Sequence, residues 1–190
     1  MFISKKKYFL IIESTKDIQL SNIKKSHKIN IIYRNKNNKD KISELSKFRK
    51  ICKMKRIKLF IANNVDLCKF LKADGIYISA NNFDLNLRRY KNFNFHIIGS
   101  AHNRKEILIK KYQGCSEIIF SRLFKTSYKF KKDYLGVVKF NLFNRSNNNQ
   151  LIPLGGIRLA NLNMIKMLNC YSFVLFSEIK KKPAIIDRLF

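Results

Sequence analysis

The chain has 190 residues, 46% of them hydrophobic, which is long enough for one domain with a substantial core and short for two. Its formal net charge of +28 comes from 40 basic and 12 acidic residues, and it predicts attraction of anionic small molecules, phosphates above all. No apolar run approaches the length that crosses a bilayer, which excludes membrane-spanning helices.

The positive charge is compatible with two classes of partner, anionic small molecules and nucleic acids. A nucleic-acid-binding protein needs a continuous basic arm or face, whereas the lysines and arginines here are spread over the whole chain. Lys, Asn, Ile, Phe and Tyr are abundant together, as AT-rich codons favour, so drift in composition explains much of the excess. We therefore expect no nucleic acid as the main partner, and keep a nucleic-acid-binding protein as the alternative from another class.

The cysteines and the start of the chain indicate in which cellular compartment the protein is expected. The basic start precedes an apolar run that ends at Glu13 without a small-residue cleavage site, so no signal peptide is expected. Four cysteines lie far apart among apolar residues and form no CxxC pair, as is typical of buried thiols in a reducing cytoplasm. They are Cys52, Cys68, Cys115 and Cys170.

Eight apolar runs of strand length recur along the chain. They are continuous rather than alternating, which suits strands buried on both faces of a parallel sheet. In chain order they are YFLII from Tyr8, INIIY from Ile29, KLFI from Lys58, GIYI from Gly75, FHII from Phe95, EIIF from Glu117, LIPL from Leu151 and SFVLF from Ser172.

Segments with helical periodicity separate most of these runs. Residues 40–56 place an apolar stripe on one face, with Asp40 as the expected N-cap. The stripe consists of Ile42, Leu45, Phe48 and Cys52.

Two further helices and one loop are predicted. Asn103 and Glu106 stand at capping-box spacing, and Gly114 is the expected stop. Residues 161–169 offer a stripe for the next helix, made of Leu162, Ile165 and Leu168. The polar stretch NRSNNNQ, from residue 144 to 150, is predicted to be a mobile loop.

Repeated strand–helix alternation predicts a compact (β/α)8 TIM barrel of parallel strands, formed by a single domain over residues 1–190. Typical barrels have about 250 residues, so some helices must be trimmed, and the first and fourth connections look thin. An open doubly wound sheet is the alternative, but neither GxGxxG nor GxxxxGK[ST] supports a nucleotide-binding version.

Polar residues follow most of the runs, where the βα loops of a barrel hold its chemistry. The set is rich in cations, hydroxyls and amides and poor in carboxylates, which is typical of a phosphate or diphosphate site rather than of a hydrolase with paired acids. Its members are Arg34, Lys36, Asn63, Asn64, Ser79, Asn81, Asn82, Ser100, His102, Asn103, Thr126, Lys129, Gly155, Gly156 and Ser177.

The glycine pair after the seventh run, Gly155–Gly156, matters most, because barrels commonly hold a phosphate on backbone N–H groups of the last two loops. Taken singly, each feature has a plainer interpretation: a turn for the glycines, a solvated strand end for Arg34 and Lys36, a capping role for His102. Their agreement in placement at successive strand ends favours one site.

Six motifs resemble, in order and approximate spacing, those of the thiamine phosphate synthase family and its TenI-like relatives. They are YRNKN, ANNVDL, ADGIYIS, GSAHN, FKTSYK and LGGI, and they extend from the second predicted strand to the eighth. The resemblance implies a compact (β/α)8 barrel. It further implies an enzyme that joins hydroxymethylpyrimidine diphosphate to thiazole phosphate and releases diphosphate with the help of Mg²⁺.

The resemblance also implies roles for individual residues. The family's diphosphate-binding residues are matched by Arg34, Lys36 and Ser100. The Thr and Lys of its sixth loop are matched by Thr126 and Lys129. The cradle for the thiazole phosphate is matched by Gly156 and Ser177.

Four positions depart from the family pattern. Where the synthases read IND, this chain has Ala62 and Asn63, and where they read HLGQED, it ends on Asn82. Two metal-binding aspartates are thus replaced by neutral amides, which weakens the expectation of Mg²⁺ although an amide oxygen still ligates it. Pro153 stands just before the glycine pair, where the family prefers a small residue.

The expected function is that of a thiamine phosphate synthase-like transferase. Two outcomes of the lost aspartates are left open: metal binding and synthase activity are lost together, or lysines such as Lys36 and Lys129 neutralise the diphosphate alone. We expect Ser100, Lys129 and His102 to act in catalysis, and no metal ligand is assigned. Substrate contacts are expected from Arg34, Lys36, Asn63, Asn82, Thr126, Gly155, Gly156 and Ser177. The alternative is a TenI-like thiazole tautomerase with His102 as acid–base group, or a non-catalytic binder of thiamine precursors. The expected partners are phosphorylated small molecules, without membrane or nucleic acid, and a homodimer is left open.

Overall fold

The computed structural model describes residues 6–23, 26–35, 40–93, 95–126, 133–148 and 150–175. Eight strands alternate with helices, as predicted: β1 (Lys7–Ile12), β2 (Ile29–Tyr33), β3 (Lys58–Ala62), β4 (Gly75–Ile78), β5 (His96–Ala101), β6 (Glu117–Ser121), β7 (Leu151–Leu154) and β8 (Ser172–Leu175). Every one coincides with a predicted apolar run to within three residues at either end.

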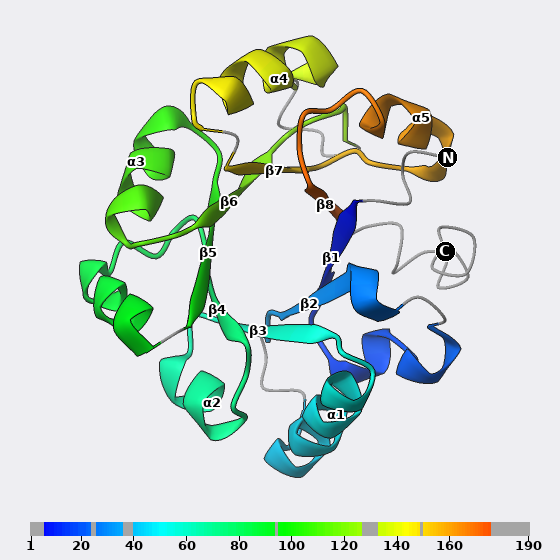
Figure 1. Cartoon of the computed structure of the whole chain (residues 1–190), viewed down its shortest axis with the longest axis vertical. Coiled ribbons are helices and arrows are strands. Elements are labelled where there is room, and N and C mark those ends of the chain that lie inside the picture. Colours follow the sequence, from blue (N-terminus) through cyan, green and yellow to red (C-terminus); the bar gives the residue numbers. More distant parts are fainter. Residues whose placement is uncertain are drawn as a thin grey trace.

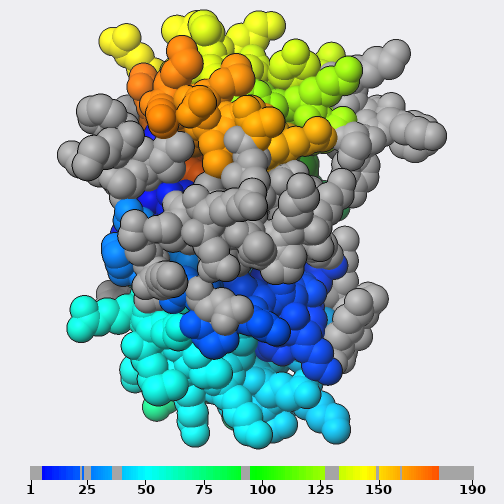
Figure 2. All heavy atoms as spheres, turned by 90° about the vertical axis from the view of Figure 1, so that its right-hand side faces the viewer, coloured from blue at the N-terminus to red at the C-terminus, as the bar shows by residue number. Residues whose placement is uncertain are grey.

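All strand pairs are parallel, in the order β7-β6-β5-β4-β3-β2-β1-β8. The two ends of this order, β7 and β8, lie next to each other. The strands therefore form a ring with the helices outside it, which is the arrangement of a (β/α)8 barrel (Figure 1). In the side view, the first strands and loops, in blue, lie between α1, in cyan, and the last described segments, in orange (Figure 2).

Side chains alternate between two apolar layers, because successive residues of a strand point to opposite faces. In β1, Tyr8, Leu10 and Ile12 belong to the outer layer under the helices, whereas Phe9 and Ile11 belong to the inner layer. The other buried members of the inner layer are Ile32, Phe60, Tyr77, Ile98, Ile119, Ile152 and Val174. Both faces of each strand are buried, which is why the runs are continuously apolar.

Five α-helices cover the ring: α1 (Ile42–Met54), α2 (Val65–Phe70), α3 (Arg104–Tyr112), α4 (Gly136–Arg145) and α5 (Leu162–Ile165). In its described residues, the first connection holds no α-helix but the 3-10 turns η2 (Thr15–Asp17), η3 (Leu20–Asn22) and η4 (Ser26–Lys28), and the fourth holds η5 (Leu85–Phe93). Another turn, η6 (Leu159–Asn161), precedes α5. The prediction of thin first and fourth connections is confirmed. None of the helices in the described part of the chain is long and apolar enough to cross a membrane.

The predicted helix signals hold for α3 and in part for α1. Asn103 caps α3, its side chain accepting from the Glu106 N–H at 2.9 Å and donating to the Glu106 carboxylate at 2.6 Å. Leu45, Phe48 and Cys52 are buried as predicted, but Ile42 is exposed in the first turn, so its place on the buried stripe was wrong.

The prediction that Asp40 caps α1 was also wrong. Lys41 occupies the cap position. The Asp40 carboxylate turns away to accept hydrogen bonds from Ser14, Thr15 and the Tyr33 hydroxyl. Three donors in a buried site outcompete a helix N-terminus for the same carboxylate.

The polar stretch from residue 144 is not wholly a loop. Helix α4 continues to Arg145, and Asn144 is fully buried. Its amide donates to the Asn169 carbonyl at 2.6 Å and accepts from the Leu151 N–H at 2.9 Å, so it joins α4 to the start of β7. The mobile-loop prediction is wrong at this end of the stretch, while Asn149 lies outside the described residues.

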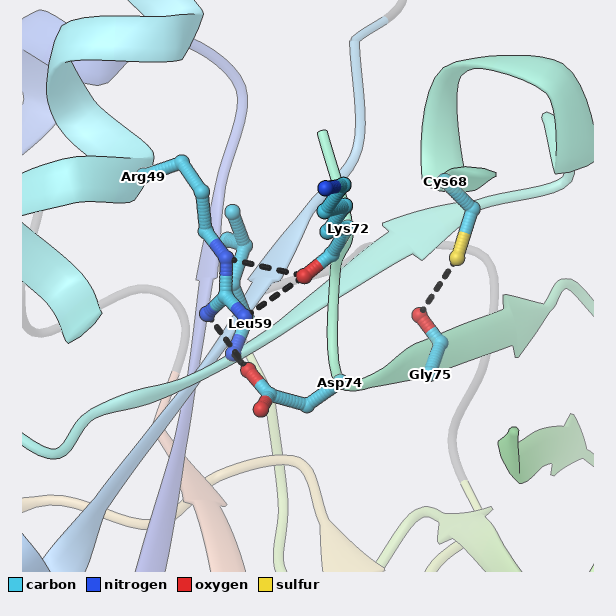
Figure 3. Close-up of polar contacts among 6 residues, drawn as sticks. All are labelled: Arg49, Leu59, Cys68, Lys72, Asp74 and Gly75. Carbon is cyan, nitrogen blue, oxygen red and sulfur yellow. Dashed lines mark hydrogen bonds and ion pairs between the residues drawn. The ribbon is translucent and has the colours of Figure 1, made fainter. Parts of the chain in front are cut away.

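A charged clamp fixes α1 against the starts of β3 and β4 (Figure 3). Arg49 donates to the Asp74 carboxylate at 2.7 Å and to the Lys72 carbonyl at 2.6 Å. The same Asp74 oxygen accepts from the Leu59 N–H at 2.8 Å.

Candidate active site

The carboxyl ends of all eight strands meet at one mouth of the ring, because the strands are parallel. Side chains two residues beyond an inner-layer residue point into this mouth. Among the described residues these are Glu13, Arg34, Ala62, Ser79, Ser100, Ser121 and Leu154, at the ends of β1 to β7. Of the residues predicted from the sequence, Arg34, Ser79 and Ser100 belong to this set, and the roles assigned to them stay predictions.

Arg34 lies at the centre of one half of the mouth. Its guanidinium pairs with the Glu13 carboxylate at 3.4 Å, and both side chains are partly exposed. Burial raises the pKa of the nearby Tyr77 phenol, while a hydrogen bond with Ser100 and the positive charge of Arg34 act in the opposite direction. Arg34, Tyr77 and Ser100 therefore lie together inside the barrel and offer a cation and two hydroxyl groups to an anion.

The two asparagines at the positions that the resemblance matches to aspartates are hydrogen-bonded to each other. Asn63 adopts the left-handed conformation with φ 55°, which turns its side chain toward the end of β4. Its amide donates to the Ser79 hydroxyl at 2.9 Å, and its carbonyl accepts from the Ser79 N–H at 3.0 Å and from the Asn82 amide at 3.2 Å. The side-chain carbonyl oxygen of Asn82 in turn accepts a hydrogen bond from the Asp84 N–H at 2.9 Å.

This donor set does not fit a magnesium ion. Mg²⁺ favours carboxylate oxygens with free lone pairs in octahedral geometry, whereas both amide oxygens here already accept backbone or side-chain hydrogen bonds. Asp66 and Asp84 line a neighbouring cavity of about 400 Å³ together with the asparagines. In the described part of the chain, no three His, Cys, Asp or Glu side chains are close enough to hold a metal ion.

A buried lysine supports the asparagine pair from behind. Lys110 of α3 donates to the Asn82 backbone carbonyl at 2.6 Å and to the Gln113 side chain at 2.9 Å. Gln113 donates to the same Asn82 carbonyl and to that of Asp84, each at 3.0 Å. Burial lowers the pKa of Lys110, with Cys115 and Glu106 acting in the opposite direction. The loop after β4 is thus anchored to α3.

His102 forms a second polar pair, between the ends of the neighbouring strands β5 and β6. Its Nδ1 lies 2.6 Å from the Ser121 hydroxyl oxygen, and the imidazole is exposed at the end of β5. Its backbone N–H donates to Glu106 at 2.7 Å, which holds the loop against α3. The contact with Ser121 engages the Nδ1 atom of the ring.

The glycine pair and the sixth loop lie together. Gly155 and Gly156 have φ values of 101° and 68°, in the region that favours glycine. A Cβ atom on Gly156 would lie 2.6 Å from the carbonyl oxygens of Phe124 and Lys125. Close packing of the two loops therefore requires glycine here, whether or not a phosphate binds.

Thr126 points into the same region. Its hydroxyl accepts from Arg122 at 3.1 Å, and the Arg122 side chain lies beside Gly155. Three predicted residues, Lys36, Lys129 and Ser177, lie outside the described residues.

Three candidate residues were missed from the sequence: Glu13, Tyr77 and Arg122. Tyr77 and Glu13 stand two residues from other inward-facing positions, Ser79 and Ile11, so alternation along the strand would have found them. Arg122 directly follows β6, so its place just after a predicted strand would have found it.

These features define a compact (β/α)8 barrel with a polar, cation-bearing mouth at the carboxyl ends of its strands. The chain belongs to the thiamine monophosphate synthase family, whose model matches residues 4–179. The sequence-based identification of this family, and of the barrel fold, is confirmed.

Named relatives agree with the family. A thiamine-phosphate synthase of Prochlorococcus marinus subsp. pastoris is 33% identical over 132 residues, covering 68% of this chain and 37% of that protein. One from Clostridioides difficile is 24% identical, covering 78% of this chain and 71% of the relative. The chain spans little more than a third of the length of the Prochlorococcus proteins it matches.

A solved structure has the same fold over its full length. Thiamine phosphate pyrophosphorylase from Pyrococcus furiosus superposes with a TM-score of 0.71 at 15% identity, covering 100% of both chains. Identity at this level shows the fold alone.

Proposed function

We propose that the chain is a thiamine phosphate synthase-like transferase that joins hydroxymethylpyrimidine diphosphate to thiazole phosphate. The observation that carries the proposal is the convergence of Arg34, Ser100 and Tyr77 inside the mouth of a barrel of this family. A guanidinium binds phosphate oxygens in bidentate fashion, and the hydroxyl groups supply further donors.

In the proposed reaction the bond between the pyrimidine methylene carbon and the diphosphate oxygen breaks, and its electron pair leaves with diphosphate. The ring nitrogen of the thiazole then donates its electron pair to the methylene carbon and forms the new C–N bond. Positive charge beside the diphosphate lowers the barrier, because negative charge develops on the leaving group. Arg34 supplies part of that charge, and we assign Lys36 and Lys129 to supply the rest.

The thiazole phosphate is assigned to the opposite side of the mouth. The backbone at Gly155 and Gly156 allows close approach, and Arg122 adds a cation beside it. Ser177 completes the proposed cradle on the evidence of the family resemblance. Binding both substrates from opposite sides would direct the thiazole nitrogen toward the methylene carbon.

We propose that the reaction here depends little on magnesium, because the Asn63–Asn82 pair lacks carboxylates and uses its amide oxygens internally. The test is an incubation of both precursors, following thiamine phosphate with and without a chelator. Slow turnover that survives chelation is expected. The Asn63→Asp/Asn82→Asp double variant is expected to gain activity by at least ten-fold, with a new dependence on Mg²⁺.

Arg34→Gln tests the diphosphate grip, with Arg88→Gln on the exposed turn η5 as the control of equal charge change. A hydrogen-bonded cation on the leaving group is worth about 2–4 kcal/mol, so turnover should fall roughly 30- to 1,000-fold in the first variant only. Full Mg²⁺-dependent activity of the unmodified protein would contradict the metal-poor mechanism, and absence of product under all conditions would contradict the transferase.

The His102–Ser121 pair favours a second candidate, a thiazole tautomerase in which His102 moves the proton. In that case His102→Gln abolishes tautomerisation of a thiazole phosphate, whereas Ser121→Ala, which only removes the orienting hydroxyl, reduces it less. If both variants retain the rate of the unmodified protein, this candidate is excluded.

A further inference from the structure

A polar pocket lies at the opposite mouth of the barrel, where the strands begin. Its volume is about 290 Å³, and aromatic rings of the inner layer, Phe9 and Phe60, form its floor. Its polar side chains come from the starts of six strands: Lys7, Asn30, Lys58, His96, Glu117 and Ser172. None of these residues belongs to the candidate active site.

The register of the sheet explains why these side chains share one layer. Lys7 is paired with Ser172 across β1 and β8, and Asn30 is paired with Lys58 across β2 and β3. Each of the six polar residues stands two positions before an inner-layer apolar residue, so its side chain points into the barrel. The register of the sheet, and not a single loop, therefore places these six polar side chains in one layer.

Two of these polar groups are buried without a partner. Asn30 is 7% exposed and Ser172 is 4% exposed, and neither side chain forms a hydrogen bond with any described residue. Their polar atoms are not fully enclosed, so they stay open to water or a ligand in the pocket. The Asn30 amide and the Ser172 hydroxyl instead line the pocket, where a ligand would satisfy them.

The charges of the pocket are unbalanced. The Glu117 carboxylate is 3.3 Å from the His96 ring nitrogen, and the Phe60 ring supports the imidazole edge-on at 5.5 Å between centroids. Lys7 and Lys58 have no ion pair with a described residue. The pocket therefore has two ammonium groups that are not used in an ion pair with a described residue, together with an amide and a hydroxyl that can donate hydrogen bonds.

We propose that this pocket is a second binding site, which takes inorganic phosphate or a small phosphate ester. Two ammonium groups and neutral donors are the complement of a dianionic oxyanion. The volume is at the lower end of the range of about 300–1,000 Å³ for small-molecule sites, so it holds a phosphate with a small organic group. The aromatic floor favours an ester whose organic part is flat and apolar.

The three histidines of the chain make the test specific. His96 lines the pocket, His102 lies at the candidate active site, and His27 belongs to η4 and does not line the pocket. Their ring resonances, assigned with single His→Gln variants, are followed by NMR at constant pH and ionic strength. The probes are inorganic phosphate and phenyl phosphate, with NaCl as the reference anion.

We expect each probe to shift the His96 resonance in a saturable way that chloride does not reproduce. Phenyl phosphate should bind more tightly than inorganic phosphate if an ester is the ligand, and no better if free phosphate is. Lys7→Gln/Lys58→Gln should weaken the His96 response at least ten-fold, whereas Lys50→Gln/Lys53→Gln, exposed on α1, should leave it unchanged.

Asn30→Leu provides a variant that does not rely on charge. It removes the unpartnered amide at similar volume, so it should raise the midpoint of thermal unfolding while weakening the His96 response. A linear His96 shift equal to that with chloride, or one that survives Lys7→Gln/Lys58→Gln, would overturn the proposal. A response of His102 reports on the active site instead, so either proposal can fail while the other holds.

Discussion

Asp40 shows how one buried carboxylate joins segments that are distant in the sequence. It accepts from Ser14 Oγ at 2.7 Å, from the Thr15 N–H at 2.8 Å and from the Tyr33 hydroxyl at 2.9 Å. These donors belong to the loop after β1 and to the last residue of β2, next to Glu13 and Arg34. Asp40 therefore fixes the backbone that bears the Arg34–Glu13 pair.

Replacing Asp40 by Asn should destabilise the fold by about 2–4 kcal/mol, because it leaves buried donors facing an amide. The loss should depend on pH. Burial works against the charged carboxylate, but the hydrogen bonds from Ser14, Thr15 and Tyr33 outweigh it and lower the pKa of Asp40. The stabilisation is then fully present above the unfolded-state pKa of about 3.9 and is lost as the pH falls through the folded-state value.

Urea unfolding at several pH values measures this effect. The difference in free energy of unfolding between the unmodified protein and Asp40→Asn should narrow in acid. Asp133→Asn, at an exposed carboxylate, is the control and should show no such narrowing. A difference that is constant down to pH 2 would show that Asp40 does not stabilise the fold through its charge.

Glu13 competes with any anion for Arg34, since the two side chains pair at 3.4 Å. Glu13→Gln keeps the size of the side chain and removes its charge. A partly exposed pair is worth about 0.5–1 kcal/mol, so we expect the dissociation constant for hydroxymethylpyrimidine diphosphate to fall about two- to five-fold. Calorimetry measures it, with Glu44→Gln on α1 as control. Weaker binding in Glu13→Gln would mean that Glu13 orients Arg34 rather than competes for it.

At the scale of residues, the sequence predicts which side chains point into the barrel but not how they pair. Strand ends and two-residue alternation suffice to place Arg34, Ser79 and Ser100 at one mouth. The use of the Asn63 amide by Ser79 and Asn82 depends on a left-handed backbone at Asn63 and on contacts across two loops. Neither the left-handed backbone at Asn63 nor the contacts between the two loops can be predicted from the neighbouring sequence.

At the scale of elements, the strands were predicted, whereas helices α2 and α4 were not. Strands buried on both faces leave continuous apolar runs, and all eight runs are strands. Helix α4 begins at Gly136 after Leu135, without a capping side chain, and its Val137 and Val138 are residues that favour strands. Packing of Val137 and Phe140 against the barrel, rather than local propensity, forms this helix.

The seventh loop offers a test of close packing at this scale. Gly156 and Gly136 have nearly equal φ values, 68° and 69°, but a Cβ on Gly136 meets nothing within 4 Å, whereas one on Gly156 meets two backbone oxygens at 2.6 Å. Gly136→Ala should cost only backbone strain, about 1–2 kcal/mol. Gly156→Ala should cost about 3 kcal/mol or more, because overpacking adds to that strain.

Thermal and urea unfolding of the two variants separate the cost of backbone strain from the cost of overpacking. Gly156→Ala should also weaken binding of thiazole phosphate, because it displaces the sixth loop from the seventh, whereas Gly136→Ala should leave binding intact. Equal destabilisation by both variants would mean that the loops move apart at little cost, and that the glycine pair is a simple turn.

At the scale of the whole molecule, the net charge of +28 on 190 residues means that positively charged side chains repel one another and destabilise the compact state. Three ion pairs join residues in the described part of the chain, and each is partly exposed. Such pairs offset little of the repulsion. The composition predicts this imbalance, but only the fold reveals that lysines also converge at the strand starts around Asn30 and Ser172.

Screening should therefore stabilise the protein. Raising NaCl from about 0.05 to 0.5 M shortens the Debye length from roughly 14 to 4 Å, so the midpoint of thermal unfolding should rise by several degrees. Sucrose at matched osmolality controls for exclusion of cosolute from the surface. Phosphate at equal ionic strength should raise the midpoint further, since binding to the folded state adds to screening, and Lys7→Gln/Lys58→Gln should remove most of that extra increment. If NaCl leaves the midpoint unchanged, the cations lie too far apart for their repulsion to matter, and the attraction of anions to the two mouths must come from the local groups alone.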